Sequence, residues 1–507
     1  MLREGSNRGP ARPASIVSAM SANIKAAASA ASNYPELTLF IDGEWLGVQG
    51  RKSQPVINPA TEEVLGSLPH ATPADLDRAL AAAQRAWGEW RALLPVQRGK
   101  ILRKAADLMR ARAEEIARIA TLEMGKSIHE TRVELQSSAE IFDWYAEEGR
   151  RAYGRVLPQR LPGQRMTIVK EPVGPVAAFA PWNFPIGNPA RKVGAALAAG
   201  CTCILKPAEE SAGSALAVAR ALSDAGLPKG VLAIVFGVPH EVSTHLIGSP
   251  IIRKVSFTGS IPVGKQLTRL AADGMQRTTM ELGGHAPVLV FDDVDVEKIL
   301  DMCATAKYRN AGQVCVSPTR FYVQESIYQK FCEGFAARAK ALPVGDGIDE
   351  ASRMGPLAHA RRLPAVQGII DESLKHGARL LAGGKRIARK GYFFEPTVLA
   401  DVPNSARIMN EEPFGPIAIL NPFRDFDAVM AEANRLPYGL AAFGFTNNAQ
   451  RVNLLGERLE AGMIGLNSFQ ISVPESPFGG VKESGHGSEE GIEGLEACLV
   501  TKFISQN

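Results

Sequence analysis

The sequence predicts an α/β protein built on a doubly wound, mostly parallel sheet. Short apolar runs that suggest buried strands, among them VGPVAAFAP and CTCILKP, alternate with amphipathic helical stretches such as EESAGSALAVARALSDAG. This alternation is typical of βαβ units, in which helices cover both faces of a parallel sheet. A chain of 507 residues is also too long for one hydrophobic core, so two or three domains are expected.

The composition excludes several classes of partner. The chain has 57 basic and 53 acidic residues. This near balance lacks the large excess of positive charge that is typical of proteins that bind nucleic acid or an acidic membrane surface. It contains no apolar run of the roughly 18 residues that a transmembrane helix needs. Eight histidines without ligand spacing predict no metal site. Six cysteines without a secreted-scaffold pattern indicate free thiols, and we expect a cytoplasmic protein that acts on a small molecule.

Residues 1–36 are rich in alanine and serine, poor in acidic residues, and are expected to form a disordered extension outside the fold. Two interpretations fit this composition. One is a mitochondrial transit peptide, which would place the protein in the mitochondrial matrix. The other, which we favour, is a flexible bacterial extension with Met20 available as a second start.

Ordered structure is expected from about residue 37, where LTLFIDGEWL alternates as a strand and contains a DG turn. Residues 73–150 show three helical periods, the first with Thr72 at its N-cap and Pro73 at its first position. The stretch 153–170 predicts a hairpin with proline and glycine at its tip. This hairpin is too polar for a core and is a candidate for pairing with another subunit.

Strands and helices then alternate from residue 171 to 278 and predict the doubly wound sheet. A second α/β unit is expected over residues 279–486. The final stretch, LVTKFIS, predicts a single strand without a local partner. Ligands of such sheets bind beyond the carboxyl ends of the strands, so residues that follow predicted strands are the candidates for a site.

Two of these strand ends suit a nucleotide. In FTGSIPVG, Gly259 ends a strand and Gly264 lies in the next helix, where glycine lets a phosphate approach backbone N–H groups. A strand-to-helix turn that only requires glycine is the alternative. In ILKPAEES, Lys206 and Glu209 suit ribose hydroxyls, although a solvated loop with an acid at a helix start explains them equally. Glu209 would repel a 2′-phosphate, which favours NAD over NADP.

Further strand ends suggest chemistry rather than binding. Asn183 lies in APWNFPIGNP between two prolines, which would hold its amide rigidly for an oxyanion hole or simply form a turn. Glu281 in MELGGHAP is a candidate general base if burial raises its pKa, although an isolated glutamate is usually solvated. Glu411 and Glu412 in NEEPFGP share this ambiguity.

Cys315 has a polar setting, RNAGQVCVSP, unlike the other cysteines. Free cysteine is most commonly a small buried hydrophobe, and the remaining five, in contexts such as LDMCATA, fit that interpretation. Around Cys315 the polar flank, Gly312 and an expected loop or helix N-terminus would favour a thiolate. A nucleophile is therefore the preferred interpretation of Cys315.

Taken together and in order, PWNFP, LKPAE, FTGS, MELGG, GQVC, EEPFGP and PFGGVKESGHG resemble the NAD(P)-dependent aldehyde dehydrogenase superfamily over about residues 38–507. The resemblance implies an aldehyde dehydrogenase-like fold with a Rossmann-like NAD-binding domain, an α/β catalytic domain, and a strand arm that pairs subunits into a homodimer or homotetramer. In that order, the domains would comprise residues 37–152 with 171–278, residues 279–486, and residues 153–170 with 487–507.

The resemblance also assigns roles by motif. Cys315 resembles the nucleophile, Asn183 with the Cys315 N–H resembles the oxyanion hole, and Glu281 resembles the base that activates the deacylating water. Thiolate attack makes the aldehyde carbon tetrahedral, hydride passes to NAD, and water hydrolyses the thioester to an acid. The residues that resemble cofactor ligands are Pro181, Trp182, Lys206, Glu209, Gly259, Ser260, Gly264, Leu282, Glu412 and Phe414.

Within the superfamily the chain is most similar to the succinate-semialdehyde dehydrogenase branch and its 2-oxoglutarate-semialdehyde relatives, through NPARKVGAALAAGC, KYRNAGQVC and ISVPESPFGGVK. That branch grips a distal carboxylate with two arginines and a serine, which match Arg191, Arg309 and Ser472. Succinate semialdehyde is the first expected substrate and 2-oxoglutarate semialdehyde the second. Some members carry a redox-active second cysteine where this chain has Ser317, so that switch is not expected.

Three rival functions stay open at this point. A broad-specificity aldehyde dehydrogenase would use Arg191 and Arg309 only as structural residues. A cofactor-independent thiol hydrolase or acyltransferase would need a histidine beside Cys315, and His285 is the candidate. A catalytically idle protein on the same scaffold is disfavoured by the intact catalytic set.

Overall fold

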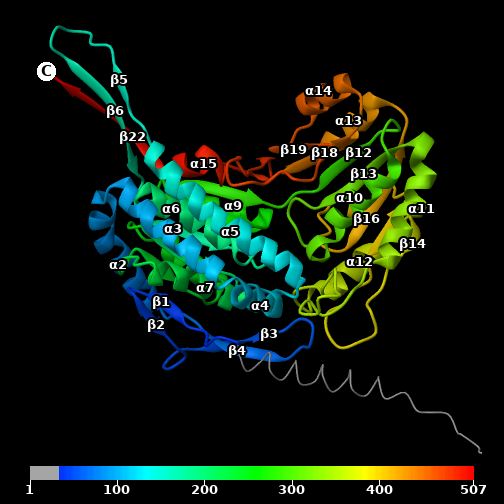
Figure 1. Ribbon diagram of the computed structural model, residues 1–507, viewed down its shortest axis with the longest axis horizontal. Coiled ribbons are helices and arrows are strands. Elements are labelled where there is room, and N and C mark those ends of the chain that lie inside the picture. Colours follow the sequence, from blue (N-terminus) through cyan, green and yellow to red (C-terminus); the bar gives the residue numbers. More distant parts are fainter. Residues whose placement is uncertain (1–33) are drawn as a thin grey trace, which may run out of the picture.

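Two sheets organise the chain in the computed structural model, which describes residues 34–507 (Figure 1). The first has eight strands in the order β2-β1-β9-β8-β7-β10-β11-β21, and the run from β9 to β11 is parallel. These strands are β1 (Leu39–Ile41), β2 (Glu44–Leu46), β7 (Val176–Ala180), β8 (Cys203–Pro207), β9 (Leu232–Ile234), β10 (Lys254–Gly259), β11 (Arg277–Leu282) and β21 (Gly485–His486). β7 and β8 are entirely buried, as their apolar sequences predict.

Helices with buried alanine and leucine faces accompany this sheet: α2 (Pro73–Ala92), α3 (Pro95–Ala111), α4 (Ala113–Met124), α5 (Ile128–Glu148), α6 (Gly187–Ala199), α7 (Ala212–Asp224), α8 (Pro239–Ile247) and α9 (Ile261–Asp273). Thr72 caps α2 as predicted, since its hydroxyl accepts from the Asp75 N–H at 3.2 Å. The stretch expected to form three helices forms four, because Arg112 leaves helical geometry (φ −107°, ψ 22°) and divides α3 from α4.

The second sheet has seven strands in the order β14-β15-β16-β13-β12-β18-β19, and only the β14–β15 pair is antiparallel. Its strands are β12 (Ala286–Val290), β13 (Pro318–Gln324), β14 (Arg379–Ala382), β15 (Thr397–Ala400), β16 (Ile417–Phe423), β18 (Ala441–Phe445) and β19 (Met463–Leu466). Its helices are α10 (Val296–Tyr308), α11 (Glu325–Ala341), α12 (Arg362–Lys375), α13 (Phe426–Asn434) and α14 (Ala449–Arg458). Residues 283–285 connect the two sheets directly.

A three-stranded arm projects away from the body of the molecule (Figure 1). It consists of β5 (Arg155–Leu157), β6 (Arg165–Pro172) and β22 (Leu499–Gln506), with β6 in the middle. β22 pairs antiparallel with β6 along its whole length, from Leu499 opposite Pro172 to Gln506 opposite Arg165. The C-terminal strand thus finds its partner in the hairpin more than 300 residues earlier in the chain.

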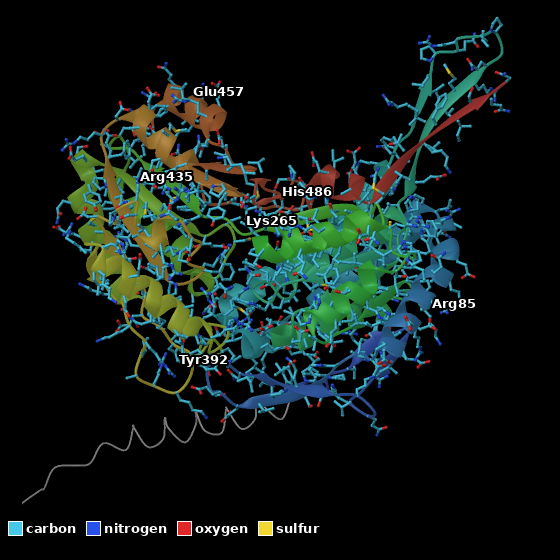
Figure 2. All side chains as sticks on the ribbon, turned by 180° about the vertical axis from the view of Figure 1, so that it is seen from behind. Arg85, Lys265, Tyr392, Arg435, Glu457 and His486 are labelled. Atoms are coloured by element: carbon cyan, nitrogen blue, oxygen red, sulfur yellow. The ribbon has the colours of Figure 1, made fainter. Side chains whose placement is uncertain are left out.

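Short elements complete the fold: β3 (Ser53–Ile57), β4 (Val64–Pro69), β17 (Tyr438–Gly439), β20 (Val481–Lys482), α15 (Gly491–Glu496) and the 3₁₀ helices η1 (Gly149–Arg151), η2 (Glu209–Ser211), η3 (Arg309–Gly312) and η4 (Arg407–Met409). The chain returns from the second sheet to the edge of the first, where His486 of β21 lies opposite Met280 of β11. Figure 2 shows Lys265 of α9 near His486 at this junction, where Lys265 pairs with Glu483 at 2.7 Å.

Within residues 34–507, no helix is long and apolar enough to cross a membrane, and no three potential ligand side chains gather as a metal site. Residues 1–33 of the expected extension lie outside the described residues. Tyr34 is anchored to the body, because its hydroxyl donates to Glu123 of α4.

Candidate active site

A cavity of about 350 Å³ opens where β7, β10 and β11 end and the second sheet begins. The predicted site residues that line it are Pro181, Trp182, Asn183, Gly259, Ser260, Glu281, Leu282, Cys315, Glu412 and Phe414. They come from both sheets and from segments more than 200 residues apart. The fold therefore brings together residues that the sequence singled out separately.

A wider cavity of about 560 Å³ adjoins the same turn, because Val316, next to Cys315, is part of its wall. Arg309 and Ser472, two of the predicted clamp residues, line it. Most of the remaining wall is apolar and includes Phe469 and Ile471. It also contains Asp301, whose carboxylate pairs with Arg338 at 2.5 Å. This second cavity provides space beside the cysteine for a molecule with an apolar middle and an anionic end.

Cys315 lies in a turn between η3 and β13. Of the two settings predicted for it, the loop is therefore correct and the helix N-terminus is wrong. The backbone before it is left-handed at three successive residues, Asn310 and Ala311 (φ 51°) and Gly312 (φ 69°). A side chain at Gly312 would collide with the Gly415 carbonyl. Such strained backbone persists only where the surroundings hold it, and it is concentrated at functional sites.

Burial raises the pKa of the Cys315 thiol to about 12, with Arg191 acting in the opposite direction and Glu412 and Glu281 adding to the rise. This direction is opposite to the thiolate-favouring environment expected from the sequence. The physical reason is that the turn is enclosed by the cavity walls rather than placed at a helix N-terminus. A base must therefore remove the thiol proton before the sulfur can attack.

Asn183 follows β7 and is buried, as an amide held in place should be. Its Nδ2 donates to the Gln313 carbonyl at 3.2 Å. A primary amide carries two hydrogens on that nitrogen, so one remains for the cavity. Among the described residues, no acceptor takes up the Cys315 N–H. The two donors predicted for an oxyanion hole are thus both available.

Glu281 is 2% exposed, and neither of its carboxylate oxygens has a hydrogen-bond partner among the described residues. Burial raises its pKa well above the usual range, Glu489 adds to this effect, and Lys192 and Arg191 oppose it. A carboxylate in these surroundings is a stronger base than one in water. The condition that the sequence left open, burial of Glu281, is met.

The start of α9 forms a cradle suited to a phosphate group. Ser260 is its N-cap, but its side chain makes no capping bond, so the first N–H groups of the helix face outward without that partner. A side chain at Gly264 would collide with Leu282, which shows how closely α9 packs on β11. Gly264 itself lies beneath the cavity rather than in its wall. The sequence placed both glycines correctly in the fold, Gly259 at the end of β10 and Gly264 inside α9.

Lys206 and Glu209 lie outside the cavity wall and form an ion pair at 2.5 Å. Lys206 is the second-last residue of β8, and Glu209 begins η2. Glu209 also accepts from the Gly237 N–H at 3.4 Å. The pair is largely buried, with side-chain exposures of 7% and 12%, so the alternative of a freely solvated loop does not describe it.

Glu412 faces the cavity with Oε1 unpaired among the described residues. Burial raises the pKa of Glu412 to about 8, against a hydrogen bond from the Gly284 N–H and the nearby charge of Arg362. Phe414 packs edge-on against Trp182, with ring centroids 5.6 Å apart. Glu411, the other glutamate of the motif, is exposed and pairs with Arg407. The ambiguity between the two is thereby resolved in favour of Glu412 as a cavity residue.

The sequence missed three basic residues of the cavity wall, His359, Arg361 and Arg362. The His359 ring lies 5.3 Å from that of Trp182, and burial lowers its pKa to about 4. Arg362 donates to the carbonyls of Pro413 and Phe414 at 2.7 and 3.0 Å. The basic run HARR at the start of α12 was the only available signal, and nothing in it pointed to this cavity.

The three predicted clamp residues differ in their surroundings. Arg191 donates to Ser472 at 2.8 Å and to Glu490 at 2.9 Å, and it stacks over the Phe478 ring at 4.1 Å. Arg309 is exposed, lies 5.5 Å from the Phe184 ring, and has no ion-pair partner among residues 34–507. Arg191 and Ser472 therefore meet directly. The charge of Arg309 acts on the buried Glu130 carboxyl, where it opposes the rise in pKa that burial causes.

His285 lines neither the 350 Å³ nor the 560 Å³ cavity. Its two ring nitrogens bond to the Thr319 hydroxyl and the Ile408 carbonyl, both at 2.7 Å. Burial lowers its pKa well below the usual value. The rival thiol hydrolase loses its candidate base, because these bonds occupy the imidazole away from Cys315.

Comparison with known proteins shows what the whole chain is similar to. Residues 45–504 match the sequence model described as the Aldehyde dehydrogenase family. The chain is 48% identical over 466 residues to 4-(hydroxymethyl)benzenesulfonate dehydrogenase TsaD1 of Comamonas testosteroni, covering 92% of this chain and 97% of that one. It is 41% identical over 473 residues to succinate-semialdehyde dehydrogenase [NADP(+)] GabD of Escherichia coli K12, covering 93% and 98%.

Among solved structures, betaine aldehyde dehydrogenase of Staphylococcus aureus in complex with NAD+ superposes with a TM-score of 0.92 at 34% identity, covering 95% of this chain and 97% of that one. The predicted fold class is thereby confirmed. With a family match over nearly the whole chain, the protein belongs to the aldehyde dehydrogenase family, whose members use NAD(P).

Proposed function

We propose that this enzyme oxidises an aldehyde that carries a distal anionic group to the corresponding carboxylic acid, with succinate semialdehyde as the first candidate substrate. The observation that carries this proposal is the exposed guanidinium of Arg309, which forms no ion pair among the described residues and lines a cavity that adjoins the Cys315 turn. A guanidinium without a protein partner is suited to a carboxylate, which it can bind with two hydrogen bonds. The 2-oxoglutarate semialdehyde has the same anionic end and is the second candidate.

The reaction begins at Cys315. Glu281, with its raised basicity, takes the thiol proton, and the positive charge of Arg191 favours the thiolate. The sulfur then bonds to the aldehyde carbon and the C=O pair moves onto oxygen. Asn183 Nδ2 and the Cys315 N–H donate to that oxyanion, a stabilisation that typically contributes about 10²- to 10³-fold per donor.

NAD, when bound, accepts the hydride that leaves the tetrahedral carbon, and a thioester on Cys315 remains. Residues 37–152 and 171–278 would form the domain that binds it, and residues 279–486 the catalytic domain. The α9 cradle would hold the pyrophosphate, Lys206 and Glu209 the adenosine ribose, and Glu412 the other ribose. Pro181, Trp182, Leu282 and Phe414 would enclose the ring. Glu412 Oε1, buried and unpaired, supports a hydroxyl partner there.

Hydrolysis of the thioester completes the cycle. Glu281, after losing its proton to solvent, takes a proton from water, and the resulting hydroxide attacks the thioester carbon. The C–S bond breaks, the acid leaves, and the sulfur regains a proton. Both Glu281 and Cys315 line the same cavity, which supports one carboxylate acting in both half-reactions.

A second candidate substrate is an aromatic aldehyde with a distal sulfonate. The 560 Å³ cavity, with Phe469 and Ile471 in its wall, has an apolar middle that suits a ring. The relative from Comamonas testosteroni is named for a benzenesulfonate substrate. Arg309 would bind a sulfonate as it would a carboxylate, since both are oxyanions.

A panel of aldehydes tests these proposals by NADH formation. The anionic substrates are succinate semialdehyde, 2-oxoglutarate semialdehyde and 4-formylbenzenesulfonate. Butanal is the uncharged control for the two aliphatic aldehydes, and benzaldehyde is the uncharged control for the aromatic one. We expect kcat/KM to be at least 10-fold higher for the anionic member of a pair. Equal values would favour the broad-specificity alternative and contradict the clamp.

We further propose that NAD is preferred over NADP, because Glu209 offers a carboxylate where a 2′-phosphate would add negative charge. We also propose that copies of this chain assemble through the arm as a homodimer or homotetramer. The arm exposes Val156 (83%), Phe503 (57%) and Ile504 (43%), and apolar side chains on a projecting sheet favour burial against another copy. Light scattering of the full chain would measure the assembly.

A further inference from the structure

We propose that Lys126, Glu130 and Glu134 are positioning residues that hold the two halves of the oxyanion site in register. Glu130 and Glu134 are four residues apart in the first turns of α5, so they lie on one side of that helix, and Lys126 lies just before its N-cap, Ser127. Two of them bond to the loop that carries Asn183, and the third to the loop before Cys315. This inference rests on the proposed roles of Asn183 and Cys315.

The first half is the Asn183 loop. Lys126 Nζ donates to the Asn183 carbonyl at 2.9 Å and to Glu134 at 2.5 Å. The other oxygen of Glu134 accepts from the N–H groups of Ile186 and Gly187 at 2.9 and 3.1 Å. One buried ion pair therefore holds the loop from Asn183 to the start of α6 at three backbone points.

The second half is the strained turn before Cys315. Glu130 Oε1 accepts from the Asn310 N–H at 2.9 Å. The Asn310 side chain donates to the Asn183 carbonyl at 3.0 Å and to the Gln313 carbonyl at 3.2 Å. Asn310 has a left-handed backbone, a conformation that costs about 1 kcal/mol or more unless it is held. Glu130 is one of the contacts that hold it.

The need for such a device follows from the fold. Asn183 follows β7 of the first sheet, whereas Cys315 precedes β13 of the second. A small shift between the sheets would separate the amide donor from the sulfur, and a misplacement of about 1 Å can cost 10²-fold in rate. The start of α5 touches both loops, so it couples their positions.

Burial supports positioning rather than stability as the role of the ion pair. Lys126 is 2% exposed, Glu134 is 6% exposed, and the Lys126 ammonium lies 3.9 Å from the centre of the Phe184 ring. Buried ion pairs often add little net stability compared with apolar side chains of the same size. What this pair provides is a defined set of donors and acceptors for one loop.

The experiment is a double-mutant cycle in the full-length enzyme with Lys126→Met, Asn183→Ala and the combined variant. We expect Asn183→Ala to lower kcat about 10²- to 10³-fold and Lys126→Met to lower it about 10- to 100-fold. In the Asn183→Ala background, Lys126→Met should cost less than 3-fold, because it acts through Asn183. The Kd for NADH, measured by fluorescence, should stay within 2-fold of wild type.

The positioning role would be overturned if the kcat losses of the two single variants multiplied in the combined variant. It would also be overturned if the Kd for NADH rose in parallel with the loss of kcat. An Asn183→Ala enzyme with wild-type kcat would instead overturn the oxyanion assignment in the proposed function. The two failures are thus read from different arms of the cycle. Glu140→Gln, at an exposed site on α5 where Glu140 only accepts from Gln136, is the control and should leave kcat unchanged.

A matched pair at Glu130 covers the case in which Lys126→Met does not fold. Glu130→Gln keeps an oxygen that can accept from the Asn310 N–H, whereas Glu130→Ala removes it. We expect kcat to fall about 10-fold in Glu130→Ala and less than 3-fold in Glu130→Gln, at unchanged Kd for NADH. Equal losses in both variants would contradict the role of this hydrogen bond.

Discussion

Arg191 donates through Nη2 to the Ser472 hydroxyl at 2.8 Å, while its Nε pairs with Glu490 at 2.9 Å. The charge of Arg191 is therefore largely met within the protein, and its guanidinium orients the hydroxyl. Arg309 has no such partner among the described residues. Of the two arginines predicted to grip the substrate, Arg309 is the one that is exposed and forms no ion pair among the described residues.

Replacing Arg309 with methionine should therefore weaken anionic substrates selectively. A charged hydrogen-bonded pair contributes about 1.5–3 kcal/mol, so we expect kcat/KM for succinate semialdehyde to fall about 10- to 100-fold. The value for butanal should change less than 2-fold. Arg424→Met is the control, because Arg424 is 80% exposed and pairs with Glu325 in another part of the second unit. Equal losses for both aldehydes would show that Arg309 is structural.

Glu281 should make kcat/KM depend on pH, with higher values at higher pH. Its raised pKa means that the carboxylate form, needed as base, is lost as the pH falls through that value. We expect kcat/KM to rise with pH to a plateau and Glu281→Gln to abolish most activity at every pH. A wild-type profile that is flat between pH 5 and 9 would contradict this assignment.

The same raised pKa has a consequence for stability. A carboxyl whose folded-state pKa is above its unfolded value stabilises the fold at low pH and loses that contribution as the pH rises through the folded value. Glutamine is neutral throughout. The Tm of Glu281→Gln should therefore exceed the wild-type Tm by more at pH 9 than at pH 4, as measured by calorimetry. A Tm difference between the variant and wild type that shrinks with rising pH would mean that the pKa of Glu281 is lowered rather than raised by folding.

Gly264→Ala should impair coenzyme binding from beneath the cavity. The added methyl would collide with Leu282 and push α9 away from β11, at a cost of about 1–3 kcal/mol in the free energy of unfolding. We expect the KM for NAD to rise about 10-fold. Gly88→Ala in α2 is the matched control, because its methyl would meet no atom within 4 Å. It should leave the KM for NAD unchanged and the free energy of unfolding unchanged or slightly higher.

Glu209→Gln should shift the coenzyme preference. Removing the carboxylate would release Lys206 from its ion pair and remove the repulsion of a 2′-phosphate. We expect the ratio of kcat/KM for NADP to that for NAD to rise about 10-fold, with Glu241→Gln on α8 as the control. A wild-type enzyme that already prefers NADP would contradict our interpretation of Glu209.

Sequence patterns predicted the elements better than their contacts. The strand ends at Asn183, Gly259 and Glu281 were correct because apolar runs and the residues that end them are local features. The helical stretch 73–150 was divided wrongly, since the break at Arg112 is marked by no proline or glycine. The C-terminal strand was predicted from its local pattern, which gave it no partner, because strand pairing depends on residues distant in sequence. Only the family resemblance placed it in one arm with the hairpin that contains β6.

The sequence by itself determined the family, the order of the strands and helices, and the candidate roles of Cys315, Asn183 and Glu281, since each depends on residue type and local spacing. Only the tertiary structure decided how these side chains are surrounded. It paired Arg191 with Glu490, left Arg309 without a partner, enclosed Cys315 and placed α5 against both catalytic loops. Charges, burial and pKa values depend on distances through space, and those distances exist only once the two sheets have packed together.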